Sequence, residues 1–201
     1  MLLRFVTALI LGAGLVATEF CPAAAQGYEM DEQRQMLIGG APRSRTYGFL
    51  GGWNDAIPKT TVSYAGTERP GTIIINTGER RLYFVLGNGT AIRYGVGVGR
   101  PGFEWAGAKT VARKAEWPDW TPPPQMLKRR PDLPRHMKGG EDNPLGARAM
   151  YLGSTLYRIH GSNEPETIGE AMSSGCFRLT NDDVIDLYNR VQVGAKVIVL
   201  R

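Results

Sequence analysis

The clearest alternation of apolar and polar positions lies in the stretch GTIIINTGERRLYFVLGNGTAIRYGVGVG, which begins at residue 71. It contains three short runs of β-branched and aromatic residues, at 72–76, 81–86 and 91–98. The runs are separated by Thr-Gly-Glu and Gly-Asn-Gly, and Gly and Asn are typical of tight turns between strands. The pattern therefore predicts a β-meander.

Further strands are predicted at residues 109–117, 158–160 and 196–200. The one helical pattern follows Thr180, which forms an approximate capping box with Asp183, and the helix is expected to end near Arg190. Because all but the last of these strands precede this helix, the order differs from that of a regular βαβ fold. The predicted fold class is therefore mainly β with minor α.

Two segments lack such periodicity. Residues 26–69 are rich in Gly, Pro, Arg and Thr, and we expect a flexible N-terminal segment with a turn or a short edge strand around residues 61–64. Residues 118–147 are rich in proline, and a loop of this length inside a compact domain is usually a lid or a binding loop. Because Trp120 and Met126 are costly to leave in solvent, a lid is favoured over an inert surface excursion.

The N-terminus, MLLRFVTALILGAGLVATEFCPAAAQ, has the pattern of a secretory signal. Arg4 precedes an apolar run at residues 5–16, which fits the range of about 7–15 residues for a signal and is too short for a spanning helix. The small residues at 23–25 form a cleavage site of the A-x-A type. Residues 1–25 are therefore predicted to be a signal peptide, with an uncleaved membrane anchor as the alternative. The mature chain is expected in the periplasm or cell envelope, with no membrane span.

The chain is mildly basic, with 24 Lys and Arg against 19 Asp and Glu. Cleavage would remove Arg4 and Glu19 and so leave the net charge at +5. A basic exported protein suits an acidic, immobile partner such as an envelope polymer, although charge can also serve solubility alone. The sequence has no long Lys/Arg block and no nucleic-acid-binding motif, so nucleic acid is not expected as a partner. No cofactor and no metal site are predicted.

Cysteine usage points to a reactive thiol. Of the two cysteines, signal cleavage would remove Cys21 and leave Cys176 alone, so no disulfide can form within the mature chain. A single cysteine in an exported protein suggests an intermolecular bridge or a reactive thiol, against the simpler role of a small core residue. A thiol attacks as its thiolate and needs a neighbouring base or cation. His160 ends the strand-like LYRIH and precedes Gly161, so it can bond a backbone carbonyl through one ring nitrogen and face a thiol with the other.

The residues around the thiol suit acyl transfer. Gly175 allows a sharp turn before Cys176, and the amides of these two residues are a candidate oxyanion hole. In an extended segment, Arg178 shares a face with Cys176. There it would favour the thiolate and offer a fork to a substrate carboxylate.

Several separated motifs together resemble the L,D-transpeptidases, the family with a YkuD-type catalytic domain. His-Gly at 160–161, a spacer, and SSGCFR at 173–178 match that family's pattern. The segments GVGVGRPG, WPDWTPPP, GGEDNPLGARAMYLG and IHGSNEP are also similar to segments of the family and follow in the same order. The resemblance covers residues 70–201. It implies a β-sandwich-like catalytic domain there. The Pro-rich loop, from its own residues, is expected to be the lid of this domain.

The resemblance also implies a reaction and roles for the motif residues. The substrate would be peptidoglycan, in which a cysteine attacks the bond between diaminopimelate and D-alanine of a tetrapeptide stem, releases D-alanine and passes the acyl group to an amine. Cys176 would be the nucleophile and His160 the base. Arg178 and Ser173 would bind substrate, and the Gly161 carbonyl would orient the imidazole. Ser174 stands where many members have a second histidine, and it is grouped with Gly175 in oxyanion stabilisation or orientation.

Alternatives to the transpeptidase remain open at this level. An amidase on the same scaffold would release a wall-linked protein or peptide by passing the acyl group to water. A non-catalytic peptidoglycan-binding module is the second alternative, and the presence of both His160 and Cys176 argues against it. The acceptor amine is also open: a second stem peptide, a lysine of an envelope protein, or a free D-amino acid.

Overall fold

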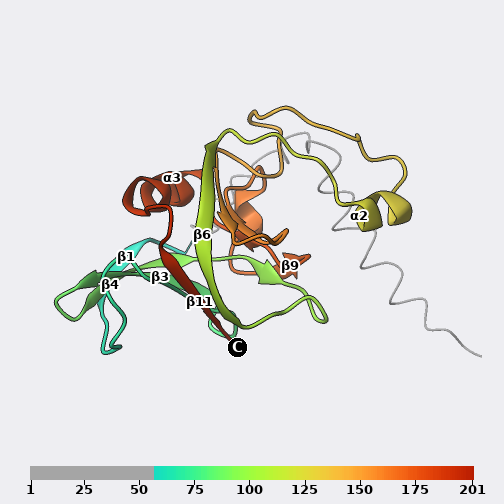
Figure 1. Cartoon of the computed structure of the whole chain (residues 1–201). Helices are drawn as coiled ribbons and strands as arrows, with labels where there is room; N and C mark the ends of the chain where they lie inside the picture. The colour runs from blue at the N-terminus through green and yellow to red at the C-terminus, as the bar shows by residue number, and fades with distance from the viewer. Residues whose placement is uncertain (1–56) are drawn as a thin grey trace, which may run out of the picture.

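The computed structural model describes residues 57–201, so the predicted signal peptide and most of the predicted N-terminal segment lie outside the described residues. Figure 1 shows a mainly β fold. Its strands are β1 (Thr60–Ser63), β2 (Ile73–Asn76), β3 (Arg81–Gly87), β4 (Thr90–Gly95), β5 (Val98–Gly99), β6 (Gly107–Glu116), β7 (Arg148–Leu152), β8 (Arg158–His160), β9 (Ala171–Ser173), β10 (Phe177–Arg178) and β11 (Lys196–Leu200). Its helices are α2 (Pro124–Arg129), the 3-10 turn η1 (Pro165–Thr167) and α3 (Asn181–Arg190).

The strands of the described part form a nine-stranded sheet in the order β1-β4-β3-β2-β11-β6-β7-β8-β10 and a two-stranded ribbon of β5 and β9. The long strand β6 joins two halves of the sheet (Figure 1). Its first residues, from Gly107 to Thr110, pair with β11, whereas Val111 onward pairs with β7, and the register shifts between Val111 and Arg113. This irregularity lets the second half depart from the plane of the first.

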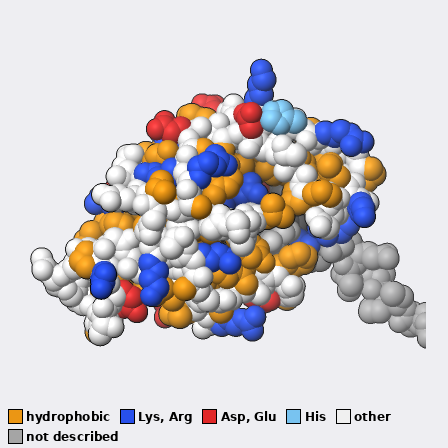
Figure 2. All heavy atoms as spheres, viewed as in Figure 1, with side chains coloured by type: hydrophobic (Ala, Val, Ile, Leu, Met, Phe, Trp, Pro, Cys, Tyr) orange, Lys and Arg blue, Asp and Glu red, His pale blue; other side chains and the backbone are white. Residues whose placement is uncertain are grey.

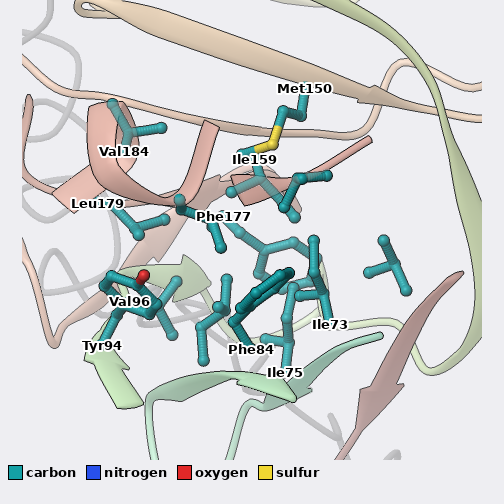
Figure 3. Packing of buried hydrophobic residues seen from close by; sticks show 14 of the residues in the cluster. Ile73, Ile75, Phe84, Tyr94, Val96, Met150, Ile159, Phe177, Leu179 and Val184 are labelled. Atoms are coloured by element: carbon teal, nitrogen blue, oxygen red, sulfur yellow. The ribbon is translucent and has the colours of Figure 1, made fainter. Parts of the chain in front are cut away.

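The main hydrophobic core lies between the two halves. Figure 3 shows Ile73 and Ile75 of β2 on one side of the cluster, and Met150 of β7, Ile159 of β8 and Phe177 of β10 on the other. Each of these side chains is at most 1% exposed. The arrangement agrees with the mainly β, β-sandwich-like class that the sequence predicted, and it places β8 and β10 against the core on one face only.

The helix after the cysteine motif forms as predicted. Thr180 precedes α3 and its hydroxyl accepts a hydrogen bond of 3.2 Å from the Asp183 amide, which is the N-cap that the sequence indicated. Val184 and Leu187 are fully buried on its inner side, and the helix packs on β7. At its other end the Lys114 ammonium of β6 donates to the carbonyl of Tyr188, in the last turn, and to that of Val191, just after it, which stabilises the negative end of the helix.

The Pro-rich segment departs from the prediction, because it contains a second helix, α2. Pro124 occupies the first turn, where its missing N–H leaves no helical hydrogen bond unmade, and Lys128 and Arg129 lie in the last turn. The loop also has a small hydrophobic cluster of its own, made of Trp120, Leu133 and Leu145 with Met126, Leu127 and Met137 at its edge. Expecting a single helix was therefore wrong, although the expectation that Trp120 does not stay in solvent is confirmed, since it is 5% exposed.

Strand β1, at the position where a short edge strand or turn was expected, pairs with β4 as the edge of the large sheet. The sheet thus begins ten residues before the boundary predicted for the catalytic domain at residue 70. Among residues 57–201, no helix is both long and apolar enough to cross a membrane.

Candidate active site

The candidate nucleophile lies in a tight turn between β9 and β10. Gly175 has a φ of +101°, and a Cβ at this position would come within 2.7 Å of the Tyr157 ring, so only glycine fits. The buried hydroxyl of Ser173 donates to the carbonyl of Cys176 at 2.5 Å and accepts from the Gly175 amide at 3.2 Å. These two bonds fix the turn and leave Cys176 partly exposed just before β10.

Strand pairing brings the histidine and the cysteine to one face. β8 and β10 are parallel, with Ile159 opposite Phe177 and His160 opposite Arg178. Ile159 and Phe177 point into the core, with 0% and 1% exposure. Because side chains alternate along a strand, His160 and Arg178 point to the other face. Cys176, two residues before Arg178, continues that face.

His160 is held as a neutral imidazole. Its Nδ1 lies 2.6 Å from the Gly161 carbonyl oxygen, and a carbonyl can only accept, so Nδ1 carries the proton. Burial, and then the cations of Arg158 and Arg178, lower the pKa of His160 from 6.5 to about 3. The unprotonated Nε2 is therefore an acceptor at neutral pH, which is the state that a general base requires.

Cys176 is a protonated thiol at rest. Burial raises its pKa, while Arg158 and then Arg178 oppose that effect. The expectation that a neighbouring arginine favours the thiolate is thus correct in direction, but burial outweighs it. The sulfur donates to the Leu156 carbonyl at 3.7 Å, and within residues 57–201 no hydrogen bond joins it to His160. Cys176 and His160 thus lie on the same face, but they are not hydrogen-bonded to each other when both are neutral.

Arg178 lies at the base of the site and is only 4% exposed. Its backbone exchanges two hydrogen bonds with Gly97, at 2.8 and 2.9 Å, which tie β10 to the segment before β5. One of its guanidinium nitrogens lies 3.9 Å from a carboxylate oxygen of Glu164. Sequence reasoning gave Glu164 no role, although this residue lies in the IHGSNEP segment that contains the His-Gly motif.

Two aromatic residues that sequence reasoning missed support the turn. Trp105 donates through Nε1 to the Gly175 carbonyl at 2.9 Å, and its ring stacks on Tyr157 with 4.7 Å between centroids. In a trans peptide the carbonyl and the following N–H point in opposite directions, so this bond directs the Cys176 N–H away from Trp105. The Gly175 N–H is already used by Ser173. Of the two amides in the predicted oxyanion hole, the Cys176 amide thus has no competing bond within the turn.

The Pro-rich loop returns to the sheet beside the histidine. Trp117 and Ala147 close its base through a hydrogen bond of 2.8 Å. Gly146, with a φ of +62°, packs so closely on Gly161 that a Cβ would lie 2.7 Å from the Gly161 carbonyl carbon. Gly139 approaches the Trp117 carbonyl even more closely, which requires glycine there. The C-terminal end of the loop therefore borders the residue that orients His160.

Metal ligation finds no support in the described part of the chain. Among residues 57–201, no group of three or more His, Cys, Asp or Glu side chains is placed to hold a metal ion. The groups gathered around Cys176 are instead an imidazole and the two guanidinium groups of Arg158 and Arg178.

Comparison with known proteins agrees with this architecture. Residues 70–199 match the family model of the YkuD L,D-transpeptidase catalytic domain. A probable L,D-transpeptidase, ErfK/SrfK of Escherichia coli, is 40% identical over 137 residues, or 64% of this chain, and one named YbiS is 39% identical over 134 residues. The match spans 43% of each of these relatives.

Solved structures show the same fold. A structure described as a probable carnitine operon oxidoreductase from Brucella melitensis is 45% identical, with a TM-score of 0.50 over 73% of this chain and 95% of that one. An L,D-transpeptidase from Mycobacterium smegmatis is 17% identical, with a TM-score of 0.53 over 65% of this chain and 58% of that one. The family match covers more than half of the chain, and the chain therefore belongs to the YkuD L,D-transpeptidase family.

Proposed function

We propose that the chain is a peptidoglycan L,D-transpeptidase in which Cys176 forms a thioester with the donor stem. One observation carries the proposal: the parallel pairing of β8 and β10 puts His160 and Cys176 on the same face, with Nδ1 of His160 bonded to Gly161 and Nε2 left as an acceptor. This is the arrangement that a cysteine acyltransferase needs, with a nucleophile, a base and a group that orients the base.

The resting groups are neutral, so the proton moves during attack rather than before it. The proton of the Cys176 thiol passes to Nε2 of His160 while the sulfur forms a bond to the carbonyl carbon between diaminopimelate and D-alanine, and the carbonyl oxygen takes the electron pair. When the tetrahedral species collapses, the C–N bond breaks and His160 returns the proton to the departing amine of D-alanine. An acceptor amine then attacks the thioester by the reverse sequence.

The turn residues serve the developing oxyanion. The Cys176 amide, directed by the bond from Trp105 to Gly175, is the proposed donor, and Ser174 lies beside it in the same turn. Ser173 contributes by holding the turn, since its hydroxyl already bonds Gly175 and Cys176. A direct contact between Ser173 and substrate would require one of those bonds to break.

Arg178 and the Pro-rich loop are the proposed substrate-facing parts. Arg178, placed two residues after Cys176 on the same face, would orient a stem carboxylate in competition with Glu164. The loop would act as a lid that keeps water from the thioester until an amine arrives. Figure 2 shows Lys and Arg side chains spread over the face drawn there, with fewer Asp and Glu, which suits an acidic polymer as partner.

The proposed setting is the periplasm or cell envelope, with a stem peptide or an envelope protein as acceptor. The test is mass spectrometry of muropeptides after incubation of purified protein with tetrapeptide-rich peptidoglycan. A transpeptidase yields 3–3 cross-linked dimers and free D-alanine. Tripeptides without any cross-linked or exchanged product would identify a hydrolase, and an unchanged muropeptide profile would identify a binding module.

A further inference from the structure

Arg158 occupies the position opposite the nucleophile on the neighbouring strand. Phe177 pairs with Ile159 across β10 and β8, so the parallel register places Cys176 next to Arg158. Arg158 is two residues before His160 and therefore lies on the same outward face. It is partly buried. Sequence motif and proposed mechanism leave this residue without a role.

The sulfur and the guanidinium meet at one oxygen. The Cys176 sulfur donates to the Leu156 carbonyl at 3.7 Å. The Nε and Nη2 atoms of Arg158 donate to the same oxygen at 3.2 and 3.1 Å. The distance from the sulfur to Nη2 therefore cannot exceed the sum of the sulfur–oxygen and Nη2–oxygen distances. The guanidinium alone already donates two hydrogen bonds to this carbonyl.

Removal of the thiol proton breaks the hydrogen bond between the sulfur and the Leu156 carbonyl. A thiolate cannot donate to the Leu156 carbonyl, so the bond that holds the sulfur there is lost, while both guanidinium bonds remain. The freed sulfur is then an anion beside a fixed cation. An opposite charge within a few ångströms favours the charged form of an ionisable group, and more so where water is partly excluded.

Among residues 57–201, few other charged or titratable groups face this site. Arg178 of β10 is a second cation, but Glu164 lies 3.9 Å from it and partly offsets its charge. His160 of β8 is neutral, and Arg158 and Arg178 both hold its pKa down. Tyr157, next to Arg158 in the chain, stacks on Trp105. Arg158 also exceeds Arg178 as the cation that lowers the pKa of Cys176.

We propose that Arg158 is a positioning residue for the nucleophile: it stays bonded to the Leu156 carbonyl as the thiol proton leaves, and it stabilises the negative charge that develops on the sulfur as it attacks the donor. The role rests on the proposed function, in which Cys176 is the nucleophile. In that reaction the thiol proton goes to His160, and Arg158 neither gains nor loses a proton, because its guanidinium stays charged throughout.

The test is the pH dependence of Cys176 alkylation by iodoacetamide, which reports the thiol directly and needs no peptidoglycan. Three substitutions separate the contributions of Arg158. Arg158→Gln keeps a donor for Leu156 and removes the charge, Arg158→Met removes both, and Arg158→Lys keeps the charge. Arg81→Met, on β3, is the control for a change in net charge.

The thiol pKa should rise by about one unit or more in the Gln and Met variants, stay closer to wild type in Arg158→Lys, and be unchanged in Arg81→Met. A thiol pKa that is the same in wild type and Arg158→Gln overturns the proposal, whatever the muropeptide assay gives. If Arg158→Met fails to fold, the comparison of the thiol pKa between Arg158→Gln and Arg158→Lys is sufficient. A shifted thiol pKa with no muropeptide product would instead refute the proposed function and leave the role of Arg158 standing.

Discussion

The indole Nε1 of Trp105 donates a 2.9 Å hydrogen bond to the carbonyl oxygen of Gly175, the residue directly before the candidate nucleophile. Trp105 is 71 positions from Cys176 in the chain, yet it determines which way the Gly175–Cys176 peptide faces. The proposed oxyanion donor of this site thus depends on a side chain outside the cysteine motif.

Substitution of Trp105 by Phe should lower the acylation rate of Cys176 by about fivefold, because it removes one net hydrogen bond, worth about 1 kcal/mol, that orients the peptide. The aromatic stack on Tyr157 is kept in this variant. Acylation would be followed by stopped-flow mass spectrometry with a tetrapeptide donor. Trp117→Phe is the control, since Trp117 is 42% exposed, and equal losses in both variants would contradict the role of Trp105.

His160→Ala should lower acylation by about 10²–10⁴-fold, the range for a lost general base. His136→Ala should have little effect, because His136 is an exposed loop residue 3.4 Å from Asp119. The two histidines are the only ones in the chain, so the pair forms a matched comparison. Equal losses would show that the base is misassigned.

The acid limb of the pH profile tests the same residue in another way. The pKa of His160 is lowered to about 3, so the imidazole stays unprotonated and able to accept a proton well below neutral pH. Acylation by wild-type protein should therefore show no loss with a midpoint near 6.5, the ordinary value for histidine. A midpoint near 6.5 that persists in His136→Ala would have to come from His160 and would contradict this electrostatic picture.

Stability at low pH should depend on Asp186 of α3. Hydrogen bonds from Arg190 and Tyr94 lower the pKa of this carboxyl from 3.8 to about 2. Since the folded pKa is the lower one, the contribution to stability is complete above about pH 3.8 and is lost as pH falls through about 2. The difference in Tm between wild type and Asp186→Asn should shrink over that window, while Asp142→Asn, an exposed loop variant, shows no such trend. A constant difference down to pH 2 would refute the assignment.

Much of the fold follows from local patterns. The bounds of β8 and β11 and the start of α3 agree with the sequence, because β-branched runs and the Thr180 cap act over a few residues. Helix α2 was missed because the prolines at 122–124 look like breakers, although proline is tolerated in a first helical turn. Pattern alone did not separate the two sheet halves, since this depends on the pairing of β6 with two different strands.

In the candidate site, too, local motifs were predictable and contacts between distant segments were not. Cys176, His160, Gly175 and Arg178 were reached from short motifs, and the structure brings the first, second and fourth to one face. Trp105 was missed because its contact spans 70 residues. Arg158 had a usable signal, since a residue two positions before His160 must share its face in a strand. Its contact with Cys176 still required the parallel register of two distant segments.

The Pro-rich loop can be tested by excision, because the structure brings its ends together. Trp120 and Met137 exchange two backbone hydrogen bonds of 2.8 Å, so a short Gly-Ser linker can replace residues 121–136. If the loop is a lid, the variant should still acylate, but the ratio of hydrolysis to transfer should rise, as measured by tripeptide against cross-linked product. An unchanged ratio would leave the loop as a surface excursion.

The most direct test of the proposed function is the intact mass of the protein after a short incubation with a tetrapeptide donor and an acid quench. Wild-type protein should gain one donor acyl group, lighter than the donor by D-alanine, and peptide mapping should place it on Cys176. Cys176→Ser should stay folded and gain no mass. An adduct on another residue, or a Cys176→Ser protein that still releases D-alanine at the wild-type rate, would contradict a thioester at Cys176.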